Sequence, residues 1–583
     1  MSLDLVVRGG TIFDGTGADR FTGDVGVKDG RIVEVGKVSA KGSREIDAAG
    51  ALVTPGFIDI HTHYDGQVSW DPILKPSVNH GVTTAIMGNC GVGFAPCRPG
   101  DRDTLIKLME GVEDIPGTAL HEGITWDWES FDEYLTALEK IERTIDIGLQ
   151  VPHNPIRLYV MGERGVRREA ATEDDIVAMQ KLVIEGLKAG GLGFTTANTV
   201  NHRDADGNPT YARLVAKEEL FRIGDAMREE GLGVLQLFND FWKETSHSFP
   251  DLIEWARRSE RPLCFTLEED PRWPEGFWQD TLKQVDEANK NGILIRPQVA
   301  PRGIGAIMGL SGSLHPFVVR PSWMSIAHLP VAEQVRLMRG PEMKAKIIGD
   351  KPLQLSKIKP SVAERADEFF YDVEAMTKGM WVMRDDLDYE QTADQTVYAM
   401  AKAAGRDPVE FVYDLMLEDE GRTLLFVPAV NYTAGNMDAV HDMLVSPHAM
   451  MALSDSGAHV GYICDGSFPT YLMSFWTRDR TRGPKISLEQ AVRLQTTASA
   501  RHIGLNDRAE IKVGMRADIN IIDYERLGFG KPYLLKDLPA GGSRIMQDAT
   551  GYLATFVNGV QTIERDQITG NKPGKVIRGV QSV

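Results

Sequence analysis

Two histidines, a cysteine and an aspartate stand where they could share one metal ion. His61 and His63 end the apolar segment PGFIDIHTH, Cys90 ends VTTAIMGNC, and Asp455 ends MMALSD. Residues two apart on a strand point to the same side, so both imidazoles can reach one ion. Imidazole, thiolate and carboxylate are ordinary zinc ligands. The pattern therefore predicts a metal site built from His61, His63, Cys90 and Asp455.

Each of the four residues also has a purely structural interpretation. The histidines could lie in a surface turn, a lone buried cysteine is more often inert than a ligand, and Ser-Asp-Ser-Gly around Asp455 is good turn sequence. Their common position at strand ends favours the metal site, because barrel enzymes keep their chemistry there. Asp455 is also the candidate catalytic residue, since a carboxylate there can take a proton from a metal-activated water and pass it to a leaving nitrogen.

The strands that would position these residues alternate with amphipathic helices. One helix is predicted to begin at Thr172, where Asp175 completes a capping box, and to end at Gly190 before the strand-like GLGFTT. This order repeats along the middle of the chain and predicts an α/β fold whose parallel sheet closes into a (β/α)8 barrel. Nine strand candidates compete for the eight places: GFIDIHTH, VTTAIMGN, DIGLQVPH, GLGFTT, VLQLF, PLCFTL, ILIRPQ, TLLFVPA and MMALSD. One of the nine must be wrong.

The chain ends have a different pattern, with short strands broken by glycine. Residues 3–53 and 511–563 both contain such strands, and the turns at Asp29-Gly30 and Asn558-Gly559 suit β-hairpins. Strands with exposed edges need partners, so we expect the two ends to pair into one β domain. The stretch from about 299 to 422 is polar, irregular and rich in methionine in places. We predict that it is an insertion after a barrel strand, of the kind that covers an active-site face.

Composition narrows the class of protein. The length of 583 residues suggests a large catalytic domain plus a smaller one. A formal net charge of −19 disfavours nucleic acid and anionic membranes as partners, so we expect a small-molecule partner. Four cysteines do not make a disulfide framework in so long a chain, and the sequence has neither a secretory signal nor a run of ~20 apolar residues. We expect a cytoplasmic protein, and a homo-oligomer is left open.

Four motifs together resemble the amidohydrolase superfamily: PGFIDIHTH, the GNCG cysteine, LSDSG and the terminal GMRADINIID. Cys90 makes the chain similar to the N-acyl-D-amino-acid deacylase (D-aminoacylase) branch, and the resemblance covers nearly the whole chain. It implies a β-sandwich of residues 1–54 and 510–583 and a TIM-like barrel of residues 55–509. It also implies a metal-dependent hydrolase of an amide bond.

The resemblance orders the candidate functions. An N-acyl amino acid is the first expected substrate, and another amide, a cyclic amide or an ester is the alternative. A non-catalytic binding protein on the same fold is the hypothesis from a different class. It would contain no metal.

Two metal-binding positions of the deacylase branch are not matched. The family has further histidine ligands at the ends of barrel strands five and six, where this chain reads VLQLFND and PLCFTLEED. By position, the replacements fall near Phe238 and near Thr266 or Leu267. The deacylases have a lysine just after the second of these histidines, and this chain has Glu268 and Glu269 there instead.

Three interpretations of this departure compete. One metal ion could sit among the four retained groups, oxygen ligands could substitute for the histidines, or the site could bind without hydrolysing. The candidate substitutes are Gln236, Asp240, Glu268 and Glu269. We favour the first interpretation, because four groups of ligand type suffice for a tetrahedral zinc site. We therefore expect one zinc ion rather than two.

Three further polar residues are weaker candidates for substrate binding. His153 ends the third strand candidate, Tyr432 lies in VNYTAG, and Arg478 lies in TRDRTRG. The first two could donate a hydrogen bond to a substrate oxygen, and Arg478 could bind an acidic group. Each also has a purely structural interpretation. His153 could be a buried histidine with its hydrogen bonds made within the protein, Tyr432 a packed aromatic residue, and Arg478 a residue of a solvated loop.

Overall fold

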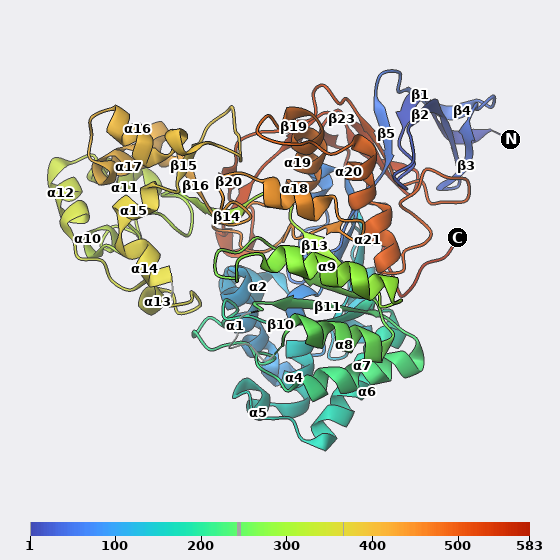
Figure 1. The fold of residues 1–583 in the computed structure, drawn as a ribbon, viewed down its shortest axis with the longest axis horizontal. Helices are drawn as coiled ribbons and strands as arrows, with labels where there is room; N and C mark the ends of the chain where they lie inside the picture. The colour runs from blue at the N-terminus through green and yellow to red at the C-terminus, as the bar shows by residue number, and fades with distance from the viewer. Residues whose placement is uncertain (1, 242–246, 365) are drawn as a thin grey trace.

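The computed structural model describes residues 2–241, 247–364 and 366–583, and its centre is a barrel of parallel strands (Figure 1). The strands are β6 (Phe57–Asp59), β7 (Val82–Met87), β8 (Asp146–Leu149), β9 (Val151–Pro152), β10 (Gly193–Asn198), β11 (Val234–Asn239), β12 (Leu263–Thr266), β13 (Ile295–Val299) and β17 (Met450–Met451). Gln150 alone separates β8 from β9, so these are two halves of one barrel strand. A parallel bridge between Thr62 and Ser456, just beyond β6 and β17, closes the ring. The predicted (β/α)8 barrel is confirmed.

The ninth strand candidate, TLLFVPA, is not a barrel strand. It forms β16 (Leu424–Val430), which pairs antiparallel with β14 (Ile304–Met308) and β15 (Trp381–Met383) in a sheet of its own. A short apolar run has the same appearance in a barrel strand and in any other buried strand. The choice between the two depended on partners that lie far along the chain.

Helices cover the outside of the barrel and return the chain to the start of the next strand. Among them are α6 (Glu173–Ala189), α7 (Lys217–Glu230), α8 (Phe249–Ser259) and α9 (Phe277–Lys290). The predicted capping box at Thr172 and Asp175 is confirmed, and Gly190 ends α6. Buried residues recur every three or four positions along α6, as at Met179 and Val183, and pack into the barrel core.

Both chain ends contribute strands to one sheet. At its centre, β5 (Leu52–Pro55) pairs antiparallel with β18 (Ile519–Ile522). The other strands are β1 (Leu3–Ile12), β2 (Phe21–Lys28), β3 (Arg31–Gly36), β4 (Gly42–Asp47), β23 (Tyr552–Val557), β24 (Val560–Glu564) and β25 (Gln567–Ile568). The hairpins predicted at Asp29-Gly30 and Asn558-Gly559 are confirmed. Figure 1 shows both termini on this side of the molecule.

Between β13 and β17 the chain forms a lobe with its own hydrophobic core, which we call the insertion lobe (residues 304–430). Its helices are α10 (Pro321–Met324), α11 (Val331–Met338), α12 (Pro341–Gly349), α13 (Leu355–Ile358), α14 (Ala366–Tyr371), α15 (Val373–Thr377), α16 (Val397–Ala403) and α17 (Pro408–Met416). Phe317, Met338 and Val412 are fully buried within it, and Figure 1 shows it projecting from the barrel. The sequence of this stretch looks irregular because helices of four to nine residues are too short to show a clear periodicity.

We propose that the domain boundaries follow these elements. The division is residues 1–54 with 510–583 for the β domain and residues 55–509 for the barrel, with the insertion at about 299–422. The sheet of β14, β15 and β16 extends the insertion lobe slightly beyond that last boundary.

Candidate metal centre

The four predicted ligands meet at one end of the barrel. His61 and His63 follow β6, Cys90 follows β7, and Asp455 follows β17. Potential ligand atoms of His61, His63 and Cys90 all lie within 4.8 Å of one another. The Nε2 atom of His61 is 3.3 Å from Cys90 Sγ and 3.5 Å from Asp455 Oδ1, and that oxygen is 3.7 Å from His63 Nε2. The four groups thus converge at the C-terminal ends of the first, second and eighth barrel strands.

Each imidazole has an oxygen acceptor near its Nδ1 atom, and that of His61 forms a hydrogen bond. His61 Nδ1 donates a hydrogen bond of 2.6 Å to Gln298 Oε1 on β13. His63 Nδ1 lies 3.3 Å from Oε1 of Glu113, the last residue of α1 (Arg102–Glu113). Such a neighbour favours the proton on Nδ1 and leaves the lone pair on Nε2. The two Nε2 lone pairs are therefore available on the side where the thiol and the Asp455 carboxylate lie.

The buried polar atoms at this point suit a cation. Asp455 Oδ1 and Glu113 Oε1 are buried, and among the described residues neither accepts a hydrogen bond. Burial, and then the charges of Glu113 and Asp455, raise the pKa of the Cys90 thiol well above its usual range. A bound cation would satisfy the oxygens and stabilise the thiolate. The donor set of nitrogen, sulfur and oxygen therefore fits a metal ion.

Two of the converging residues have a strained backbone. Cys90 has φ of 53° and Asp455 has φ of 45°, in the left-handed region that non-glycine residues rarely adopt. The Cys90 N–H donates a hydrogen bond of 3.2 Å to Gln236 Oε1, and the Asp455 N–H donates one of 3.2 Å to the carbonyl of His61. Strain of this kind, about 1–3 kcal/mol per residue, persists only where the surroundings hold it and is common at functional sites.

His61, His63, Cys90 and Asp455 line a cavity, and the positions where the deacylase branch has its two further histidines lie on this cavity too. Phe238 of β11 and Thr266 of β12 both line it. His202, from the loop after β10, also lines the cavity and stacks on Phe238, with ring centroids 5.3 Å apart. Burial lowers the pKa of His202 to about 3, so its ring is neutral at ordinary pH. An aromatic pair thus occupies part of the space beside the metal centre.

Of the four suggested substitute ligands, only Glu268 lines the cavity, where burial raises its pKa to about 8. Gln236 uses its side-chain oxygen to hold the Cys90 backbone. Asp240 accepts hydrogen bonds from Thr199 Oγ1 and the Val200 N–H at 2.6 and 2.7 Å. The Glu269 carboxylate accepts one from the Thr433 N–H at 3.0 Å. Three of the four are therefore engaged in local structure.

None of the three predicted substrate-binding residues lines the cavity. His153 is buried between Thr196 Oγ1 and Glu219 Oε1, at 2.9 and 2.8 Å. The Tyr432 hydroxyl donates to the carbonyl of Gln391 and accepts from Arg482. Arg478 pairs with Asp479 and donates to the carbonyl of Leu527. Each side chain supports neighbouring backbone or another buried side chain.

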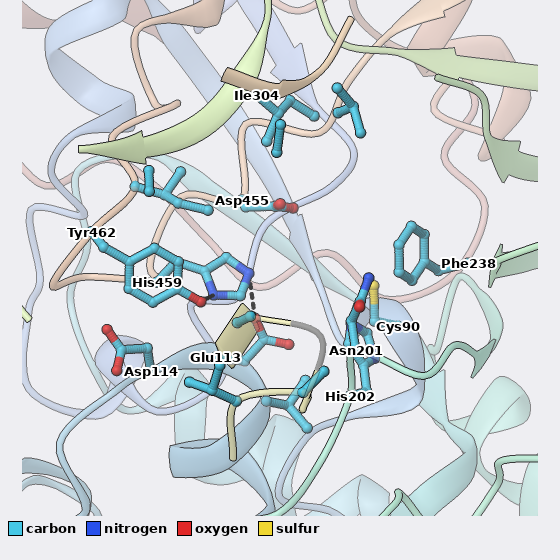
Figure 2. Close-up of a pocket in the computed structure, with 18 of the residues that line it drawn as sticks. Cys90, Glu113, Asp114, Asn201, His202, Phe238, Ile304, Asp455, His459 and Tyr462 are labelled. Atoms are coloured by element: carbon cyan, nitrogen blue, oxygen red, sulfur yellow. Dashed lines mark hydrogen bonds and ion pairs between the residues drawn. The ribbon is translucent and has the colours of Figure 1, made fainter. Parts of the chain in front are cut away.

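Three further residues of the site, Glu113, Gln298 and His202, were not predicted from the sequence. Figure 2 shows Glu113 beside His459 on one side of the cavity, with His202 and Phe238 on the other. His459 Nε2 is 3.6 Å from Glu113 Oε2, and its Nδ1 is 3.2 Å from the Tyr462 hydroxyl. A histidine soon after the fourth strand was a signal for His202, and a glutamine in the strand ILIRPQ was a signal for Gln298. Glu113 ends a helix far from any motif and had no comparable signal.

Replacing Glu113 with glutamine should weaken metal binding about 10- to 100-fold, because partners that orient a ligating histidine typically contribute that much. Glutamine keeps the shape but presents either a weaker acceptor or an N–H to His63 Nδ1. Competition against a chelator of known affinity would measure the change. The matched control is Glu122→Gln, since Glu122 is exposed on α2 (Gly117–Gly123). Equal metal affinity in both variants would contradict the orienting role.

Comparison with known proteins gives a family match over most of the chain. The model described as Amidohydrolase family matches residues 44–563. The N-acyl-D-aspartate deacylase of Alcaligenes xylosoxydans xylosoxydans is 24% identical, over 98% of this chain and 95% of its own length.

Two solved structures share the fold. D-aminoacylase, described with a binuclear metal centre that is activated by one metal and attenuated by a second, is 22% identical with a TM-score of 0.64. The N-acyl-D-glutamate deacylase of Bordetella bronchiseptica, solved with zinc and a phosphonate mimic of the tetrahedral intermediate, is 21% identical with a TM-score of 0.63. Each comparison covers 99% of this chain and 100% of the other.

Proposed function

Because the chain belongs to the amidohydrolase family, we propose that it uses one bound zinc ion to hydrolyse the carbon–nitrogen bond of a small amide. The observation that carries the proposal is the convergence of His61, His63, Cys90 and Asp455 on one point of a large cavity. The four donors are enough for one zinc ion, and a catalytic site leaves one position open for water, which Asp455 would vacate to move the proton. Near the expected positions at strands five and six stand Phe238 and Thr266, which do not suit a second ion.

In the proposed mechanism Asp455 moves the proton. Zinc, when bound, supplies Lewis-acid chemistry that lowers the pKa of water and polarises a carbonyl. The Asp455 carboxylate accepts a proton from the attacking water, whose oxygen bonds to the carbonyl carbon. The same carboxyl group returns the proton to nitrogen as the carbon–nitrogen bond breaks, and the products are a carboxylic acid and an amine.

Gln298 and Glu113 act on the histidines rather than on the substrate. By keeping the proton of each ring on Nδ1, they keep Nε2 of His61 and His63 free to bind the ion. The hydrogen bond from the Cys90 N–H to Gln236 holds the thiol on the same point. These contacts prepare the site before any substrate enters.

The relatives name the first substrates to test. They deacylate N-acyl-D-aspartate and N-acyl-D-glutamate, so N-acyl-D-amino acids are the first candidates. A different amide, cyclic amide or ester is the second candidate. It is favoured because Lys359 and Arg272, the lysine and arginine among the described residues that line the cavity, are both paired with acidic side chains and are less available to a substrate carboxylate. We also propose a cytoplasmic location, because all four cysteines are free. No described helix is both long and apolar enough to cross a membrane.

Elemental analysis joined to a hydrolysis panel tests the proposal. We expect about one zinc ion per chain, loss of amide hydrolysis on chelation, and recovery when zinc is returned. The panel should contain N-acyl-D- and N-acyl-L-amino acids beside aryl amides, cyclic amides and esters. A protein that binds no metal and hydrolyses none of them would instead be a binding protein on this fold.

A further inference from the structure

The cavity at the metal centre has an apolar wall that belongs to the insertion lobe. The cavity has a volume of about 640 Å³, and its lining includes Ile304 and Ala306 of β14 with Val427 and Val430 of β16. In this antiparallel pair, Ile304 lies opposite Val430 and Ala306 lies opposite Val427. Side chains opposite one another on neighbouring strands are in contact. The four therefore form one continuous apolar patch.

The patch continues into the segment before α14, where Val362 and Ala363 also line the cavity. Figure 2 shows Ile304 on the far side of Asp455 from Glu113. A substrate whose scissile bond lies at Asp455 would therefore extend one end toward the insertion lobe. That end would meet aliphatic side chains.

The basic groups of the cavity are already engaged. Among the described residues that line it, Lys359 and Arg272 are the only lysine or arginine. Lys359 forms an ion pair with Asp114, and Arg272 Nε donates to both carboxylate oxygens of Asp270 at 2.6 and 2.7 Å. A substrate carboxylate would have to share a basic group whose charge is already balanced by an acidic side chain.

The acidic side chains reinforce this bias. Glu113, Asp114, Glu268 and Asp455 all line the cavity. A carboxylate on the substrate would be repelled by those of the four that are ionised, whereas a neutral group would not be. Burial raises the pKa of Glu113 and Glu268, so these two contribute less to the repulsion. The charge pattern thus disfavours acidic substrates, while the lobe offers apolar contact.

We infer that the substrate is a neutral amide with a bulky apolar group that packs against Ile304, Ala306, Val362 and Val427, and that N-acyl amino acids, which all carry a carboxylate, are poor substrates. This inference rests on the proposed amide hydrolysis and narrows its substrate class. It separates this chain from the relatives that act on N-acyl-D-aspartate and N-acyl-D-glutamate.

Two matched series of compounds test the inference. The first is N-acylanilides with acyl chains of increasing length, and the second is the same chains on 4-aminobenzoate, which adds only a carboxylate. We expect kcat/KM of the anilides to rise about three- to fourfold per methylene until the cavity is filled, as burial of each methylene predicts. Each aminobenzoate should be hydrolysed at least tenfold more slowly than its anilide. A flat chain-length profile, or a preference for the aminobenzoates, would overturn the inference.

Variants of the wall locate the effect. Ala306→Leu should abolish the gain in kcat/KM from long chains, because the larger side chain fills the apolar patch. Val362→Thr keeps the volume, so it serves if the first variant folds poorly, and it should reduce the gain per methylene. Ala327→Leu is the matched control, since Ala327 lies in the same lobe outside the cavity. Unchanged profiles in both wall variants would contradict the assignment of this wall.

Asp114→Asn should release Lys359 and improve acidic substrates. We expect kcat/KM for the aminobenzoates to rise several-fold relative to the anilides. Asp103→Asn, on the helix α1 that Asp114 follows, should have no effect, since the Asp103 side chain is exposed. Asparagine tolerates the left-handed backbone at residue 114, where φ is 51°. No relative gain would contradict the argument from paired charges.

Binding measured without turnover separates this inference from the proposed function. Calorimetry with octananilide and N-octanoyl-4-aminobenzoate on the Asp455→Asn protein should show tighter binding of the anilide. If that preference holds but the native protein hydrolyses no amide, the proposed function fails and the inference about the ligand stands. If amides are hydrolysed without the preference, the inference alone fails.

Discussion

Substitution of Asp455 by asparagine should lower the turnover of every amide substrate by about 10³-fold or more, because positioned general acid–base groups typically contribute 10²–10⁴-fold. Asp455 Oδ1 faces both histidine Nε2 atoms and has no hydrogen-bond donor among the described residues. Asparagine has nearly the same shape but cannot accept a proton at neutral pH. Steady-state kinetics on the best amide substrate, with metal content measured on the same sample, would give the loss in kcat directly.

The control for this variant is Asp442→Asn, since the Asp442 side chain is 61% exposed and does not line the cavity. Both variants should have the same unfolding temperature as the native protein. If Asp455→Asn retained more than a tenth of the native kcat with the metal still bound, Asp455 would not be the group that moves the proton. Loss of both activity and metal would show that ligation is its main role.

Replacement of Cys90 by serine should remove most of the bound metal. Cys90 Sγ is 3.3 Å from His61 Nε2, and loss of a direct ligand should exceed the roughly 10- to 100-fold effect of an outer partner. The thiolate is the softest donor of the set, so zinc should suffer more than a harder ion such as manganese. Metal content per chain after dialysis against a weak chelator would measure the loss.

Cys97→Ser is the matched control for that experiment. Cys97 is also buried in the loop after β7, but its Sγ lies 3.4 Å from the carbonyl of Arg98 and does not line the cavity. We expect its metal content to equal that of the native protein. Two zinc ions per native chain would contradict the single-ion site, and an unchanged metal content in Cys90→Ser would remove Cys90 from the ligand set.

The parts of the fold that repeat a local pattern could be predicted from the sequence. Thr172, Asp175 and Gly190 define α6 through their own chemistry, and the two hairpins follow from Asp-Gly and Asn-Gly turns. The position of β16 could not, because its identity depends on pairing with β14 across more than a hundred residues. The helices of the insertion lobe are too short for their periodicity to emerge.

The candidate site divides in the same way. His61, His63, Cys90 and Asp455 could be found because each ends a strand, and strand ends meet at one face of a barrel. Gln298 accepts a hydrogen bond from His61, and Glu113 lies beside His63 Nδ1, but the sequence shows neither of these pairings. His153 was a reasonable candidate at a strand end, yet its ring is fully engaged by Thr196 and Glu219. Position in the fold was predictable, whereas the direction and partner of each side chain were not.

The sheet shared by the two chain ends has a consequence for synthesis. Strand β5 leaves the ribosome about 460 residues before its partner β18, which at roughly 5–20 residues per second is a delay of about 25 to 90 s. Throughout that time the nascent amino-terminal strands expose an unpaired edge. We therefore expect overproduction to demand chaperones or slow growth, and any chain shortened at the carboxyl end to aggregate even with the whole barrel present.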